Sequence, residues 1–236
     1  MQRFDKILIV LDAQMDVNRV AELCFTMALD NNAAITVVDS VPEVSWLARI
    51  VGSELDKLRD EAREGVQQRL EGFVNLLTKK GVSAAAKPLD GTSWLAVVAE
   101  VREGGYDLVI ASGRAEEDEE NRFLGRSARR LMRNCPAPLW LIPASSPSEI
   151  REVLACVDTG SENPVDSELN DRVYRLAASI AAHHKAQLSV LHAWDMEDER
   201  LLRARLRATT VDGYLEEARD YRAHLLERFL RQYGAT

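Results

Sequence analysis

Cysteine is scarce in this sequence, and none of it stands in a metal-binding or redox pattern. The chain has three cysteines, Cys24, Cys135 and Cys156, which are far apart and form no Cys-x-x-Cys pair. Disulfide-rich scaffolds and zinc sites need several cysteines at close, regular spacing. We therefore expect buried free thiols in a reducing compartment, and the sequence assigns no metal site.

Long apolar runs and an excess of positive charge are also missing. No apolar run approaches the ~18 residues that a membrane-spanning helix needs. The formal net charge of −8 argues against nucleic-acid binding driven by bulk electrostatics. The N-terminus leads directly into an apolar run and shows no signal-peptide pattern. We expect a cytoplasmic protein that spans no membrane and binds no nucleic acid.

The common catalytic motifs are absent. The sequence has no Gly-x-Ser-x-Gly elbow, no Walker A loop and no supportable serine–histidine–acid arrangement. The histidines His183, His184 and His192 have no acids or cysteines at ligand spacing. We therefore assign no catalytic residue and expect no enzymatic activity.

What the chain does contain is an internal repeat. An apolar run that ends in an aspartate, Phe4 to Asp12, returns as Ile150 to Asp158. A helical pattern and a second apolar run follow in each copy, Ala34 to Val38 in the first and Gln187 to Leu191 in the second. A unit of roughly 145 residues is long enough for its own core. The sequence predicts a complete domain over 1–144, a linker over 145–149 and a partial second domain over 150–236.

The first copy alternates strands with helices. Apolar runs predict strands at 7–11, 34–41, 82–89, 106–111 and 139–142, with helical spacing between them. This alternation favours right-handed crossovers and a parallel sheet with helices on both faces. The second copy contains only strand, helix, strand and a last helix from about Glu197 to Tyr233, with a predicted break near 209–213. Such a half is marginal alone, so we expect it to lean on the first half or on another chain, or the sequence to be a fragment.

These residues resemble the universal stress protein family, and within it the tandem, E-type members. The resemblance rests on Ile9 to Asp12, on Asp107 to Ile110, and above all on the run from Phe123 to Trp140. That run begins a helix at Gly125 and closes on Arg-Asn-Cys-Pro-Ala-Pro-Leu-Trp. The resemblance implies an α/β fold with a five-stranded, Rossmann-like parallel sheet ordered 3-2-1-4-5, plus an incomplete β-α-β-α second copy.

The resemblance also implies where a nucleotide would bind. ATP-binding members hold adenine at positions that match Asp12 and Val38, and hold the phosphates on a Gly-x-x-Gly loop followed, nine residues later, by Gly and Ser or Thr. Of that loop only Gly125 keeps its place, because Gly113 is one position out of register. Arg126 stands where Ser or Thr is expected. The phosphate-binding pattern is therefore degenerate.

The charge of this loop departs further from the family. Residues 116–120 are five consecutive acids, and each unit-charge pair at ~6 Å repels by about 3 kcal/mol at an effective dielectric of 20. Several such terms would erase a micromolar affinity of about −8 kcal/mol. Nearby arginines could pair with these acids or hold a smaller anion: Arg114, Arg122, Arg126, Arg129 and Arg130.

Two interpretations of the loop stay open. It could be a solvated charge run with Arg126 and Ser127 on the helix surface. Alternatively, Gly113, Gly125, Arg126 and Ser127 could form a nucleotide or anion site. In the second copy, Asp158, Thr159 and Leu191 match the adenine side, and the phosphate loop would lie beyond Thr236. We expect Asp158 to act as a strand-end cap.

The sequence thus favours a non-catalytic stress-adaptation protein that acts through ligand or protein contacts and needs no cofactor. One alternative is an ATP- or adenine-nucleotide-binding protein with slow ATPase activity. A second alternative is a carrier of a small apolar ligand. Leu139 to Ile142 should be an edge strand, and edges invite pairing. We therefore expect a homodimer that buries this edge or exchanges the partial domain.

Overall fold

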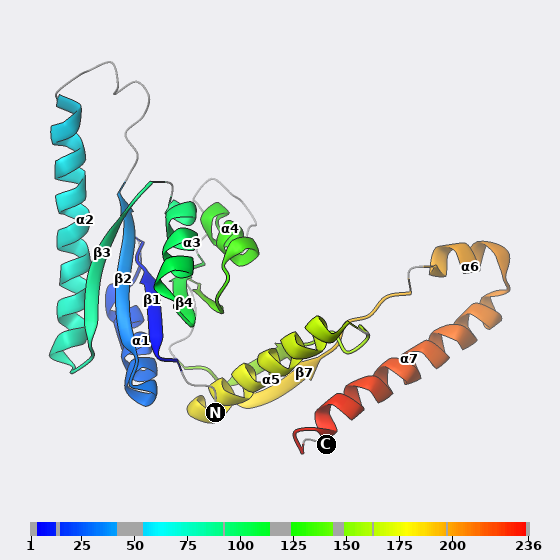
Figure 1. The fold of residues 1–236 in the computed structure, drawn as a ribbon. Helices are drawn as coiled ribbons and strands as arrows, with labels where there is room; N and C mark the ends of the chain where they lie inside the picture. The colour runs from blue at the N-terminus through cyan, green and yellow to red at the C-terminus, as the bar shows by residue number, and fades with distance from the viewer. Residues whose placement is uncertain are drawn as a thin grey trace. The chain divides into compact units, whose positions relative to one another are not determined.

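The computed structural model describes residues 4–12, 15–41, 54–91, 93–113, 124–143, 149–161, 163–196 and 198–234. The chain forms two compact units, one within 3–148 and one within 149–236. Figure 1 shows their elements along the chain. Each unit is described by itself.

The first unit is a parallel five-stranded sheet with the predicted strand order. Its strands are ordered β3-β2-β1-β4-β5, which confirms the predicted 3-2-1-4-5 sheet. The strands are β1 (Lys6–Val10), β2 (Ala34–Val41), β3 (Ala84–Asp90), β4 (Leu108–Ser112) and β5 (Leu139–Ile142). The crossover helices are α1 (Val17–Asn31), α2 (Glu54–Lys79), α3 (Ser93–Gly104) and α4 (Arg126–Asn134).

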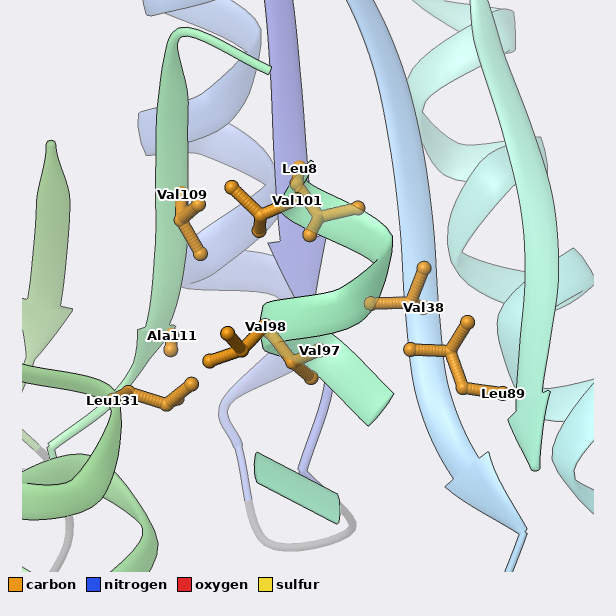
Figure 2. Packing of buried hydrophobic residues seen from close by; sticks show 9 residues of the cluster. All are labelled: Leu8, Val38, Leu89, Val97, Val98, Val101, Val109, Ala111 and Leu131. Atoms are coloured by element: carbon orange, nitrogen blue, oxygen red, sulfur yellow. The ribbon is translucent and has the colours of Figure 1, made fainter. Parts of the chain in front are cut away.

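The central strand β1 is apolar throughout because both of its faces are covered. Its residues Ile7, Leu8 and Ile9 are fully buried. Figure 2 shows α3 packed over the face that carries Leu8 and Val38, with further helices behind the sheet. Val97, Val98 and Val101 of α3 close this side of the core. A strand buried on both faces is typical of a doubly covered parallel sheet.

The second unit has a smaller sheet of two parallel strands. It contains β6 (Glu152–Cys156), α5 (Pro164–His184), β7 (Gln187–Leu191), α6 (Glu199–Arg205) and α7 (Ala208–Arg231). Asn163 caps α5 through its side chain and Pro164 follows at the first helical position, as such positions favour. The predicted break in the last helix was misplaced, because the chain is extended at Leu206 and Gly213 lies inside α7.

The internal repeat extends further than the two apolar runs. Each first helix ends at a residue in the left-handed conformation, Asn32 and Lys185, both with φ of 52°. The sequence Glu-Ala-Arg occurs in α2 at 61–63 and in α7 at 217–219, and a phenylalanine follows ten residues later in both helices. In the second unit this phenylalanine, Phe229, packs edge-on against Tyr174 of α5, with ring centroids 5.9 Å apart.

Candidate functional site

The carboxyl ends of β1 and β2 lie side by side, which brings Asp12 and Val38 together. The backbone N–H of Leu11 donates to the carbonyl of Val38 over 2.8 Å, and Asp12 follows on the surface. The Val38 side chain is fully buried under α3, in the cluster that Figure 2 shows. In the described part of the unit, this valine therefore belongs to the core and presents no open wall to a ligand.

The residue after Val38, Asp39, forms an ion pair that the sequence did not predict. Asp39 and Ser40 lie within β2. The Arg69 guanidinium of α2 lies 2.5 Å from Asp39, whose side chain is only 14 % exposed. Burial raises the pKa of Asp39, and Arg69 opposes that rise, whereas nearby Asp12 adds to it. This end of the sheet therefore combines two acids, Asp12 and Asp39, with Arg69. The three residues are far apart in the sequence, so the sequence pattern does not indicate that they meet.

Gly113 is held by contacts with β5. Its N–H donates to the carbonyl of Ile142 over 3.0 Å. A Cβ atom at this position would lie 3.2 Å from a methyl group of Leu124 and 3.5 Å from Leu141. A side chain at this position would therefore have to displace the Leu124 methyl group slightly. Gly113 and Leu124 are in contact although ten residues separate them, and residues 114–123, with all five acids of the loop, lie outside the described residues.

Helix α4 begins at the predicted position, directly after Gly125. Gly125 is the N-cap residue and supplies no side-chain hydrogen bond to the first turn. Arg126 and Ser127 are exposed at that turn. Uncapped amides at a helix start favour anions. The nucleotide or anion site at Gly113, Gly125, Arg126 and Ser127 stays a prediction.

A polar network lies on the α3 side of the sheet. Glu100 of α3 is 6 % exposed. Its carboxylate accepts from Lys87 Nζ over 2.5 Å and from the Tyr106 hydroxyl over 2.9 Å. The hydrogen bond to Glu100 raises the pKa of Lys87, and burial raises the pKa of Tyr106. The helical pattern of α3 does not distinguish Glu100 from a surface acid. The residues that bind it lie outside the helix, Lys87 in β3 and Tyr106 after the end of α3.

In the second unit, Asp158 is part of a closed turn. Its carboxylate accepts from Gly160 N–H over 3.0 Å, and its backbone N–H and carbonyl bond the Asn170 side chain. The Arg222 guanidinium of α7 lies against Gly160, where a Cβ would be 1.6 Å from its Nη1. The Thr159 hydroxyl is buried without a hydrogen-bond partner in the described structure. These contacts fasten the turn to α5 and cover it with α7.

Leu191, the match for Val38, lies in a different environment. It pairs with Cys156 in the β6–β7 register but is 46 % exposed, whereas Val38 is buried. Val38 thus packs against α3 in the first unit, whereas the side chain of its match Leu191 is exposed in the second unit.

The described residues were also compared with the requirements of a metal site and of a membrane-spanning helix. Within them, no three His, Cys, Asp or Glu side chains gather in a group that could hold a metal ion. None of the helices in the described part of the chain combines the length and apolar character that a membrane crossing requires.

Comparison with known proteins agrees with this fold. Residues 3–143 match the model of the universal stress protein family. Universal stress protein E of Escherichia coli (strain K12) is 28 % identical over 86 residues, which are 36 % of this chain and 27 % of that protein. Universal stress protein E of Salmonella typhi is 26 % identical over 85 residues, again 27 % of its length. The matched segment thus spans about a quarter of these relatives.

A solved structure extends the likeness to the whole chain. A functionally unknown protein of Pseudomonas aeruginosa PAO1 superposes with a TM-score of 0.67 and 18 % identity, covering 99 % of this chain and 71 % of that one. At this identity the likeness concerns the fold alone.

Proposed function

Because the chain belongs to the universal stress protein family, we propose that it is a non-catalytic stress-adaptation protein that acts through ligand or protein contacts. The observation that supports the proposal is the burial of Val38, which matches an adenine-side position of the family. Val38 is buried under α3, and the next residue, Asp39, is engaged by Arg69. An adenine ring at Val38 would meet buried core packing, and the family's phosphate-loop position carries five consecutive acids in this sequence, residues 116–120.

The test is a direct search for bound nucleotide. Pure protein is heated, and the released small molecules are separated by ion exchange. We expect no stoichiometric adenine nucleotide and no thermal shift in millimolar Mg-ATP. Arg126→Ser, which restores the family's residue after Gly125, is the matched variant and should also show no shift, because the acids remain. Stoichiometric release of adenine nucleotide would overturn the proposal.

Adenine-nucleotide binding with slow ATPase activity is the second candidate. The uncapped start of α4 favours it, since its first amides have no side-chain acceptor from Gly125. A thermal shift in Mg-ATP that Arg126→Pro removes would support it, because proline deletes the N–H of the first helical residue.

A carrier of a small apolar ligand is the third candidate, favoured by the exposed Leu154 and Leu191 in the second unit. Organic extraction of the native protein followed by mass spectrometry tests it, and an empty extract counts against it.

We also propose that the protein is a cytoplasmic homodimer that pairs through β5 or exchanges its second unit. The position of β5 at the end of the sheet order supports the first mode. Light scattering at high concentration should give twice the chain mass. A monomer under those conditions contradicts both modes.

A further inference from the structure

Helices α2 and α7 match each other along the internal repeat, but two residues that α2 buries are polar in α7. The shared Glu-Ala-Arg motif and the phenylalanine that follows it align Val66 with Arg222 and Leu77 with Tyr233. Val66 is 3 % exposed and Leu77 is fully buried in the first unit. Arg222 and Tyr233 are partly exposed in the second. A guanidinium or a phenol on the inner face of a helix needs a partner, so these two positions indicate contacts that α2 does not make.

Tyr233 fastens the end of α7 to α5. Its ring stacks on Tyr174 of α5 with centroids 4.0 Å apart and meets Phe229 edge-on at 5.3 Å. Its hydroxyl donates a hydrogen bond to the Asp171 carboxylate of α5. Arg175 binds the same carboxylate over 2.7 Å and lies over the Tyr233 ring at 5.9 Å. These contacts fix the phenol in position, and we call the hydrogen bond between Tyr233 and Asp171 the latch.

About three helical turns before the latch, Arg222 lies on the turn that follows β6. A Cβ atom at Gly160 would overlap the Arg222 guanidinium, so the missing side chain leaves room for it. The same turn carries Asp158, whose carboxylate accepts from the Gly160 N–H over 3.0 Å. Helix α7 therefore covers the Asp158 turn with Arg222 and is fastened to α5 at Tyr233.

The covered turn adjoins two buried polar atoms that have no hydrogen-bond partner among the described residues, the Thr159 hydroxyl and His192 Nε2. The His192 side chain is 4 % exposed, and its Nδ1 lies 3.1 Å from the Val157 carbonyl and 3.9 Å from the Asp158 carboxylate. A carbonyl only accepts, so Nδ1 donates and Nε2 is left as an acceptor. Burial of such groups costs free energy, and an open turn would expose them to solvent. The closed state therefore needs contacts that offset their burial.

We propose that α7 is a strap that opens and closes over the Asp158 turn, with the hydrogen bond between Tyr233 and Asp171 as its latch. In the closed state Arg222 lies on the turn, and in the open state α7 leaves it. The helix is continuous from Ala208 to Arg231, so a contact at its end restrains Arg222 as well. Loosening the latch raises the population of the open state. The device controls access to the turn and does not require that a nucleotide binds there.

The experiment measures the reactivity of a thiol placed under the strap. In the full chain with Cys135→Ser and Cys156→Ser, Thr159→Cys puts a thiol in place of the buried hydroxyl. The buried Cys24 stays in the chain. A thiol reagent reaches the new cysteine only when the turn is open, so the labelling rate measures the open population. All further variants are compared in this background.

Tyr233→Phe keeps the ring stack and removes the latch. Because a hydrogen bond to a charged acceptor is among the stronger ones, this change should speed labelling about tenfold. Tyr221→Phe is the matched control and should leave the rate unchanged, since Tyr221 lies in the same helix and is 60 % exposed. Arg222→Val, which restores the residue of the first unit, should also speed labelling because it uncovers the turn directly.

A second variant tests whether the phenol acts through the carboxylate. Asp171→Ala should speed labelling at least as much as Tyr233→Phe, and combining the two should add nothing, because both remove one bond. Additive effects overturn the latch.

Three other outcomes overturn the proposal. The first is a Tyr233→Phe protein that labels as slowly as its parent, and the second is equal acceleration by Tyr221→Phe. The third is a labelling rate that rises with urea as steeply as unfolding of the second unit, because a local opening exposes little surface. No nucleotide is added in these measurements, so their failure leaves the proposed function untouched.

Discussion

Removing the lysine of the buried network in the first unit should cost stability by a predictable amount. Glu100 is 6 % exposed and accepts two hydrogen bonds, from Lys87 and Tyr106. Lys87→Met keeps most of the side-chain stem but leaves the carboxylate with one donor fewer. A hydrogen bond to a charged group contributes about 1.5–3 kcal/mol. Because Lys87 is 52 % exposed, water screens the pair, and we expect the lower end, about 1–2 kcal/mol.

Chemical denaturation of wild type and Lys87→Met measures this loss, provided that both proteins unfold with the same m-value. Thermal unfolding serves as a check. A loss of this size lowers the Tm of a unit this large by about 3–8 °C. Glu100→Leu combined with Lys87→Met removes both charged partners and should recover part of the loss, because buried ion pairs replaced by apolar groups are often neutral. A double-mutant cycle should therefore give a coupling of about 1 kcal/mol.

The pH dependence follows from the raised pKa of Lys87. A lysine whose folded pKa exceeds its ordinary 10.5 contributes its full stability below that pH and loses it as the pH rises through the folded pKa. The difference between wild type and Lys87→Met should thus stay constant from pH 6 to 9 and shrink above about 10.5. The reasoning is refuted if the variant is as stable as wild type at pH 7, or if the difference changes between pH 6 and 9.

Three further predictions concern single side chains. Leu8→Ala should destabilise the protein by about 2–5 kcal/mol and Leu154→Ala by under 0.5, because Leu8 is fully buried and Leu154 is 58 % exposed; equal losses in denaturant titrations would mean that Leu154 is buried in solution. In the native protein, the exposed Cys156 should react with a thiol reagent within minutes. Burial raises the pKa of Cys24 to about 12, so Cys24 should react only after unfolding. Burial raises the pKa of Tyr233 to about 12, so its contribution to stability is full below pH 10 and lost as the pH rises towards 12; ultraviolet titration of Tyr233→Phe should lack this late-ionising phenol.

Much of the first unit could be predicted because its signals are local. Continuous apolar runs indicated covered strands, and Gly125 marked the start of α4 correctly. The misses involve partners that the fold brings together. Nothing near Glu100 in the sequence indicates that Lys87 and Tyr106 donate to it, and nothing near Asp39 indicates Arg69.

The second unit was predictable in its elements but not in its surface. The repeat predicted the positions of β6 and β7 in the sequence. The matching apolar residues are nevertheless buried in the first copy, as Leu8 and Val38, and exposed in the second, as Leu154 and Leu191. An apolar pattern shows which side chains of a strand can be buried. Whether they are buried depends on the helices and strands that pack around them. The candidate nucleotide-binding residues were predicted from the positions they share with the family. A motif does not show which elements pack over these residues, as α3 packs over Val38.

The bond between Asn170 and the turn at Asp158 bears on how the second unit folds. Both groups of the Asn170 amide bind the backbone of a residue only twelve positions earlier. A contact of such short range closes quickly, because little chain entropy is lost in forming it. The strand–turn–helix segment from β6 to α5 can therefore form before β7 pairs with β6, and early protection of the Asp158 amide in pulse-labelled hydrogen exchange during refolding would report this step.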